Sequence, residues 1–324
     1  MTLQTGLAAQ FGIKAQTNYD TPATVDRFYE FESEAIDTDV GIIRMPQLGA
    51  GRFLRSDRRK AYIRGARGAA TFVVMNKGFG LLLEHCIGQN TVTGAGADKT
   101  HTIIPDANAL QGKALTVQVG RPDVSGTVQP FTFQGCKVTD WELKCAVDEA
   151  LKLTATFDAK TVVEASALAE ASYPTALEPF IFTEGALTIN GTTTFVKGAT
   201  IRSSNALATE RRGLTNTKKE PLANGIASVT GSLECEFEDL TKYSAWVAGT
   251  VVANLVLTFT SPTLIPTTAV PFSLTVTIPA IAYNGKNPTV GGPDVVMQPM
   301  EFEALNNGSD PVISLVIKTS DTAS

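Results

Sequence analysis

The two halves of this chain carry the same kinds of segment in the same order. In each half, a glycine-rich charged stretch precedes an alternating strand, a short helix that ends at a glycine, and three further alternating strands. The charged stretches cover residues 49–67 and 209–225. The offset between the two sets is roughly 140–165 residues, about the size of one small domain. We therefore predict two tandem β domains, residues 1–165 and 179–324, joined by a linker at 166–178.

Alternation of apolar and polar residues dominates the chain and predicts antiparallel strands with one solvent-exposed face. A hairpin is predicted at 141–157, where every odd position from Trp141 to Val147 is apolar and a turn follows at 148–149. The other predicted strands are 69–75, 115–119 and 131–138 in the first half, and 232–238, 255–260, 272–278 and 300–305 in the second. The predicted fold class is mainly β.

Each half has one predicted helix, at 76–88 with Asn76 as its cap and at 239–249 with Asp239 as its cap. Apolar residues at helical spacing should face inward; they are Phe79, Leu82, Leu83, Cys86 and Ile87 in the first helix and Leu240, Tyr243, Trp246 and Val247 in the second. A third possible helix, 161–172, precedes prolines and lies in the linker region. Chance similarity is the alternative to duplication, because β-rich sequences align with themselves easily.

Composition argues against several classes of function. The formal net charge is −5, without a basic tail, so the overall sign repels nucleic-acid phosphate. We see no leader pattern and no run of about 18 apolar residues, and we expect neither export nor membrane insertion. The four cysteines form no CxxC pair, and buried free thiols are favoured over disulfides. Synthesis in a reducing cytoplasm fits this pattern.

No catalytic, cofactor or metal site is predicted. The two histidines, His85 and His101, have no partner at a metal-ligand spacing, and both are expected on the surface or partly packed. The glycine-rich fragments at 48–51 and 93–96 lack the spacing of a phosphate-binding loop and are interpreted as ordinary loops. The Asn-Gly pairs at Asn190 and Asn307 indicate tight turns.

The strongest concentration of charge lies in the two basic stretches. Their basic residues are Arg52, Arg55, Arg58, Arg59, Lys60, Arg64 and Arg67 in the first half and Arg211, Arg212, Lys218 and Lys219 in the second. Three interpretations are open: a solvated loop, a loop that contacts a neighbouring subunit or ring, and direct DNA binding. The acidic chain disfavours DNA binding. Glu234, Glu236 and Glu238, on one strand face, could supply an acidic partner surface.

Four segments of the sequence resemble the major tail tube proteins of long-tailed bacteriophages. They are FGIKAQTNYDTPAT at 11–24, FTFQGCKVTDWELKCAVDEALKLTATFDAK at 131–160, IRSSNALATERRG at 201–213 and ASVTGSLECEFEDLTKYSAWVAGT at 227–250. None of these motifs is catalytic. Their ordered combination over most of the chain is more specific than any one of them, and the apparent duplication resembles the two-domain variant of the family.

The resemblance implies a fold and an assembly. Each domain would be a β-sandwich or partial barrel with one short helix, and six domains would close a barrel around a lumen. Three copies of a duplicated chain would then form a pseudo-hexameric ring, whereas six copies would make one half an outer decoration. Stacked rings would form the virion's tail tube, with tape measure and tail terminator or tip proteins as partners. Double-stranded DNA would pass through without specific binding.

A carbohydrate- or receptor-binding β-sandwich, such as an adhesin, is the alternative function. That class would present clustered exposed aromatic residues, whereas Trp141 and Trp246 fall on apolar faces. A hydrolase would need paired carboxylates on opposed strands. The acidic residues instead occupy wet faces of alternating strands, so we predict a structural protein without enzymatic activity.

Overall fold

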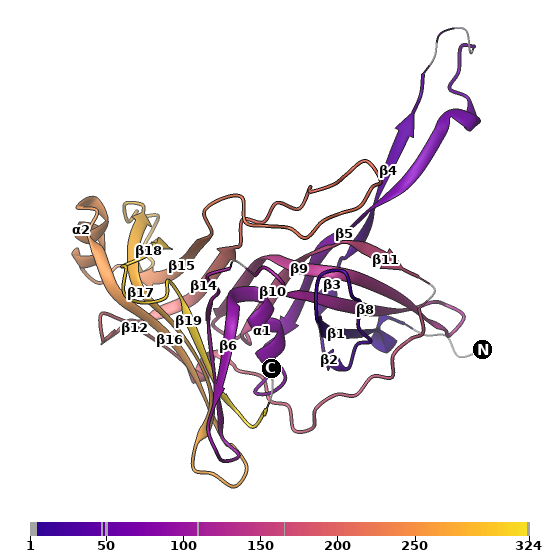
Figure 1. Ribbon diagram of the computed structural model, residues 1–324. Helices are drawn as coiled ribbons and strands as arrows, with labels where there is room; N and C mark the ends of the chain where they lie inside the picture. The colour runs from indigo at the N-terminus through magenta and orange to yellow at the C-terminus, as the bar shows by residue number, and fades with distance from the viewer. Residues whose placement is uncertain (1–4, 47, 49–50, 109, 165, 323–324) are drawn as a thin grey trace.

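The structure is a computed structural model that describes residues 5–46, 48, 51–108, 110–164 and 166–322 (Figure 1). The fold is mainly β, as predicted, and every strand pairing among the described residues is antiparallel. The strands of the first half are β1 (Gln10–Gln16), β2 (Arg27–Tyr29), β3 (Ser33–Glu34), β4 (Asp37–Arg44), β5 (Arg59–Val73), β6 (Gly88–Thr93), β7 (Lys99–Pro105), β8 (Ala114–Pro122), β9 (Val128–Ala146), β10 (Lys152–Ala159) and β11 (Thr161–Val163).

The strands of the second half are β12 (Gly185–Ile189), β13 (Thr192–Thr193), β14 (Val196–Ser204), β15 (Ser228–Glu236), β16 (Val251–Leu264), β17 (Pro271–Gly285), β18 (Met297–Ala304) and β19 (Ser314–Thr319). The helices are α1 (Gly80–Ile87) and α2 (Thr241–Val247), and the 3-10 turns are η1 (Gly6–Ala8), η2 (Ser56–Arg58) and η3 (Phe182–Glu184). The Asn190-Gly191 turn joins β12 to β13 with positive φ at both residues, which is the conformation that a two-residue hairpin requires.

One sheet runs through both halves of the chain. Its strand order is β4–β5–β10–β9–β14–β15–β18–β17, and β9 pairs with β14 along Gly198–Ser204. In the first half, β9 also bends into a second sheet with β8, β1 and β2. The hairpin of β6 and β7 crosses to the second half, where β7 pairs with β19. The division into two domains at 166–178 therefore stays a prediction.

The second half repeats the strand pairing of the first. The series β5–β10–β9–β8–β1 has its counterpart in β15–β18–β17–β16–β12. A short helix follows β5 and β15 alike, and β11 lies on β9 as β19 lies on β17. Matching topology over this many strands supports duplication over chance similarity.

The two helices define the sequence offset between equivalent residues of the two halves. Gly80 and Thr241, the first residues of α1 and α2, are 161 positions apart (241 − 80). The same offset relates Arg67 of β5 to Ser228 of β15 (228 − 67), whose strand partners are Asp37 and Ser204. The β4–β5 hairpin, 37–67, is therefore the counterpart of the segment 204–228.

The continuous sheet buries one face and exposes the other. On the buried face the row of cross-strand neighbours runs Phe72, Leu153, Leu143, Ile201, Gly231 and Phe302. Gly231 permits this packing, because a Cβ atom there would lie 2.4 Å from the Phe302 ring. The next row, on the opposite face, is polar throughout: Thr71, Thr154, Glu142, Arg202, Thr230 and Glu303. The four cysteines are buried and free, as predicted.

The structure corrects several sequence predictions. α1 is capped at Phe79, and Asn76 is instead buried, with its side-chain oxygen accepting a hydrogen bond from the Glu178 N–H. The third predicted helix, 161–172, begins as β11 and continues without regular structure. Its backbone groups form hydrogen bonds with a side chain instead. The Gln118 amide nitrogen donates to the Ala167 carbonyl, and the Gln118 amide oxygen accepts from the Ala169 N–H.

Three further predictions of burial are wrong. Val147 is exposed, because β9 ends at Ala146 and the turn begins. Leu240 and Val247 of the second helix are also exposed, whereas their α1 counterparts lie in the core. Conversely, both histidines are fully buried and not at the surface or partly packed. The ring of each is held by hydrogen bonds, His85 to the Leu81 carbonyl and His101 to Asn90 and the Asp321 carbonyl.

Candidate assembly surfaces

The β4–β5 hairpin projects away from the rest of the protein (Figure 1). Its strands pair from Asp37 and Arg67 out to Arg44 and Arg59, and the described residues beyond them are mostly exposed. It also exposes large apolar side chains: Val40, Ile42, Ile43, Met45, Leu48, Phe53, Leu54 and Ile63. Exposed apolar residues gathered on a projecting element are typical of a surface that binds a partner.

The hairpin is strongly basic. Residues 37–67 contain eight arginine and lysine residues and three aspartates. Asp57 lies 3.0 Å from Arg55, whose hydrogen bond lowers the pKa of the Asp57 carboxyl, and Arg64 lies at 4.0 Å from Asp39. Because three acidic groups offset only part of the eight positive charges, the hairpin favours an acidic partner surface.

The second basic stretch lies against the first half of the same chain. Lys218 donates hydrogen bonds to Asp158 at 2.7 Å and to the Ala159 carbonyl at 3.0 Å. Asn216 donates to the Ile63 carbonyl at 2.7 Å. The segment 204–228 thus spans from β14 across β10 to the base of the β4–β5 hairpin, as Figure 1 shows.

Buried charges hold this segment in place. Lys137 lies 2.6 Å from Glu220 and donates to the Leu110 carbonyl at 2.5 Å. Burial lowers the pKa of Lys137, and Glu220 opposes that shift. Burial raises the pKa of Asp158, and Lys218 opposes it. Each charge has its partner within hydrogen-bond reach, which is the condition under which a buried ion pair is tolerated.

The basic residues singled out in the sequence thus fall into two groups. Those of the first half all lie on the projecting hairpin or at its base: Arg52, Arg55, Arg58, Arg59, Lys60, Arg64 and Arg67. Those of the second half lie in segment 204–228. There Arg211 donates to the Glu220 carbonyl, and Arg212 lies 3.8 Å from Glu210. Lys218 is buried, whereas Lys219 is exposed. Their role in contacts between subunits or rings stays a prediction.

The α2 region is a third candidate surface, which sequence reasoning missed. Leu240 is 60% exposed and Val247 is 63% exposed, although their spacing matches the buried stripe of α1. α1 is covered in part by the second half, because Asn205 donates to the Cys86 carbonyl at 3.1 Å and to the Val138 carbonyl at 3.0 Å. Nothing in the described chain covers α2 in the same way.

A model of the phage tail tube protein family matches residues 6–304. The chain belongs to the phage tail tube protein family. No curated protein matches the sequence. The family is a structural one whose members assemble into the tube of the virion tail, so this tail tube protein is placed among structural proteins and not in an enzyme family. None of the helices in the described chain is long and apolar enough to cross a membrane.

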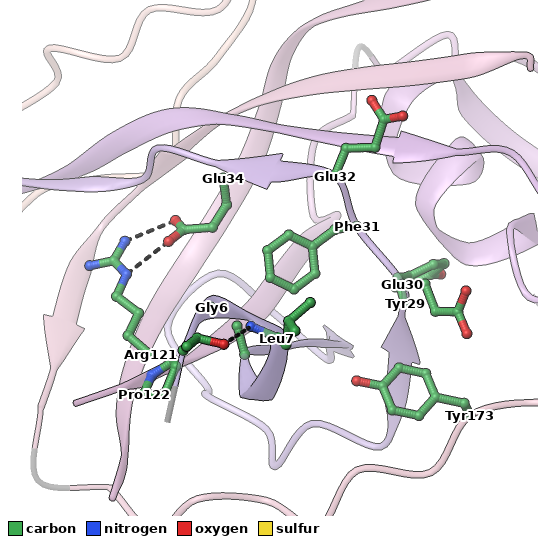
Figure 2. Close-up of a pocket in the computed structure, with 12 residues that line it drawn as sticks. Gly6, Leu7, Tyr29, Glu30, Phe31, Glu32, Glu34, Arg121, Pro122 and Tyr173 are labelled. Atoms are coloured by element: carbon green, nitrogen blue, oxygen red, sulfur yellow. Dashed lines mark hydrogen bonds and ion pairs between the residues drawn. The ribbon is translucent and has the colours of Figure 1, made fainter. Parts of the chain in front are cut away.

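A cavity of this tail tube protein lies between η1, β2, β3 and the end of β8 (Figure 2). Glu34 accepts two hydrogen bonds from Arg121, both 2.9 Å long, and Arg121 also donates to the Ile36 carbonyl at 2.7 Å. Glu32 lies 2.9 Å from Lys152. The lining includes neither histidine nor cysteine. The Glu34–Arg121 pair binds β3 to β8, and the Glu32–Lys152 pair joins the residue before β3 to β10, so both pairs have a structural role.

The histidines and carboxylates do not assemble into a metal site. Within the described part of the chain, no three histidine, cysteine, aspartate or glutamate residues lie together in a group that could hold a metal ion. The Leu81 carbonyl can only accept, so Nδ1 of His85 carries the proton at the 3.0 Å contact. Burial lowers the pKa of His85 to about 4, which keeps its ring neutral near pH 7.

Proposed function

We propose that the chain contains two tail-tube units, residues 1–165 and 179–324, with 166–178 as the linker. Three chains would then supply the six units of a pseudo-hexameric ring. Stacked rings would form the conduit through which the genome leaves the virion. The observation that carries this proposal is the repeated strand pairing, which gives the second half the same potential inner strands as the first.

The continuous sheet supports ring formation because it ends in unpaired edges. β4 pairs only with β5 among the described strands, and Tyr283–Gly285 of β17 pair only with β18. Exposed strand edges invite pairing with other chains, and closure into a barrel removes them. A head-to-tail contact between different surfaces closes a ring when its rotation divides a full turn.

The exposed face of the sheet has the chemistry that we propose for the lumen. Thr154 and Thr156 are small and polar, and their neighbours on adjacent strands are small or acidic: Thr71, Ala69, Glu142 and Asp140. Two basic groups on this face have acidic partners, since Arg202 pairs with Glu142 and Lys152 with Glu32, and Lys144 is a further, exposed basic group on it. The β15–β18 portion adds exposed carboxylates at Glu301 and Glu303. Such a surface would let DNA pass without binding it.

The remaining partners follow from a tube in a virion tail. A tape measure protein would occupy the lumen during assembly, and terminator and tip proteins would cap the two ends. The chain would be synthesised in the host cytoplasm and would function in the virion. We also propose that the tail belongs to a siphovirus-like particle.

Electron cryomicroscopy of tubes assembled from the purified protein tests the proposal. We expect three chains in each ring, with both halves lining the lumen. Six chains in each ring with one half outside would refute the two-unit arrangement. A protein that stays monomeric at high concentration, even with a tail tip complex as initiator, would contradict the tube function itself.

A further inference from the structure

The contact between the two halves of one chain provides a template for the contact between two chains. Inside the chain, segment 204–228 leaves β14 and extends over the first half, where it covers the C-terminal end of α1. Its counterpart, the β4–β5 hairpin, leaves the same position in the first half but has no such surface to cover within its own chain. α2 is the counterpart of α1 and lies at the opposite end of the molecule from the hairpin (Figure 1). Trp246 packs against the core, but Leu240 and Val247 stay exposed.

We infer that the β4–β5 hairpin of one copy packs over α2 of the next copy, in the way that segment 204–228 packs over α1. This inference rests on the proposed function and adds to it the two surfaces that meet. The occupant of the α2 surface is thus a second copy of this chain. The counterpart of Asn205 is Thr38, and the counterpart of Cys86 is Val247, so these two residues should lie close across the contact.

Exposed apolar side chains on both surfaces support the contact between the hairpin and α2. The hairpin exposes Val40, Ile42 and Ile43 along β4, and the α2 region exposes Leu240, Val247 and Val251. In the template, the α1 counterparts of Leu240 and Val247 are Phe79 and Cys86, and both are buried. Burial of the hairpin and α2 side chains against each other would remove apolar surface from water on each copy.

Charge supports it as well. The hairpin carries eight basic residues against three acidic ones. The segment from Ser228 to Thr250, which contains β15 and α2, carries four acidic residues and one lysine. Surfaces of opposite charge at opposite ends of a molecule favour head-to-tail association and disfavour pairing of like ends.

The strand edges agree with the same arrangement. In the template, β9 pairs with β10 on one side and with β14 of the second half on the other. β17, the counterpart of β9, pairs with β18, but its residues from Tyr283 to Gly285 have no strand on the other side among those described. The chain segment at the base of the hairpin, around β3 and the start of β4, is the counterpart of β14 and would lie beside this edge.

Crosslinking with paired cysteines tests the contact. The double variant Thr38→Cys/Val247→Cys, assembled and treated with a short bismaleimide, should give a ladder of covalent dimers and trimers. Each single variant should give none. An equal mixture of the two single variants should give dimers and nothing longer, because each chain then offers only one of the two thiols. The four native cysteines are buried and serve as an internal background in the wild-type protein.

Microscopy of the same samples separates this inference from the proposed function. Tubes without crosslinks in the double variant would overturn the hairpin–α2 contact and leave the tube function intact. Crosslinked oligomers without tubes would support the contact and contradict the tube. A protein that remains monomeric and uncrosslinked would overturn both. As a second measurement, Val247→Lys should leave the circular dichroism unchanged and strongly reduce sedimentable assemblies; unchanged sedimentation would also contradict the contact.

Discussion

Lys218 and Asp158 form a buried ion pair that joins the two halves of the chain. Lys218 Nζ lies 2.7 Å from Asp158 Oδ1, and both side chains are almost fully buried. The pair is 60 residues apart in sequence and connects a basic segment of the second half to β10 of the first. Because Lys218 is bound inside its own chain, the second basic stretch has a structural role in the fold. Its counterpart in the first half, the β4–β5 hairpin, is exposed instead.

Removal of this cation should destabilise the fold strongly. Lys218→Ala leaves a buried carboxylate without its partner, and we expect the free energy of unfolding to fall by about 3–5 kcal/mol. Lys14→Ala is the matched control, because Lys14 pairs with Asp26 on the surface and its loss should cost about 0–1 kcal/mol. Urea denaturation monitored by circular dichroism measures both. Equal losses for the two variants would contradict a special role for the buried pair.

Stability should decrease in mild acid because of His85. The pKa of His85 is about 4 in the folded protein, against 6.5 for an ordinary histidine. Between these values the unfolded chain binds more protons than the folded one, so the free energy of unfolding falls as the pH drops. The shift corresponds to about 3 kcal/mol, lost progressively from about pH 6.5 to pH 4.

The variant His85→Gln removes this titration. Thermal unfolding at several pH values should therefore show a shallower decline between pH 6.5 and pH 4 for the variant than for the wild type. The carboxylates contribute the same background to both proteins. Parallel curves would show that His85 is not the group responsible.

Charge reversal on the hairpin should impair assembly without unfolding the chain. Exposed ion pairs contribute about 0–1 kcal/mol each, but a tube repeats every contact. We expect Arg58→Glu/Arg59→Glu/Lys60→Glu to raise the protein concentration needed for polymerisation about tenfold or more, which corresponds to 1.4 kcal/mol or more. The triple Gln variant separates loss of charge from reversal and should have a smaller effect.

Sedimentation and electron microscopy measure assembly, and circular dichroism on the same samples measures folding. Normal tubes from the reversed variant at wild-type concentration would refute the interface role. A loss of β signal would show that these side chains support the fold instead.

The cysteines should react slowly in the native protein. Burial raises the pKa of all four thiols, to about 11 for Cys145, which lowers the fraction of reactive thiolate. Alkylation with iodoacetamide followed by mass spectrometry should label Cys145 before Cys86 and Cys136, because the latter two side chains are completely buried. All four should react rapidly in urea. Rapid native labelling of Cys86 would indicate that α1 opens readily.

Added positive charge tests which face lines the lumen. Thr154→Lys/Thr156→Lys places two cations on the exposed face of β10. If that face lines the lumen, purified tubes should bind short double-stranded DNA in a salt-dependent manner, and the Thr154→Glu/Thr156→Glu control should not. DNA binding by neither variant, with tubes intact, would exclude this face as the lumen.

Local sequence was sufficient to predict the family and several of the strands, among them β8, β9, β10, β16, β17 and β18. Alternation from Trp141 to Cys145 reports a strand with one buried face, because successive side chains of a strand point to opposite sides wherever the strand lies. The turn at 148–149, the Asn190-Gly191 turn and the buried stripe of α1 have the same local origin. The resemblance to tail tube proteins was correct for the same reason, since its motifs follow these local patterns.

Only the tertiary structure decided which surfaces are covered. α1 and α2 have similar apolar stripes, yet Cys86 is buried and Val247 is exposed, and Asn205, from a distant part of the chain, donates a hydrogen bond to the Cys86 carbonyl at the end of α1. The ion pair of Lys218 with Asp158 and the pairing of β7 with β19 likewise join residues far apart in sequence. The periodicity of apolar residues shows that one face of an element is apolar. Which other element covers that face depends on packing between residues far apart in sequence, and a local pattern does not contain this information.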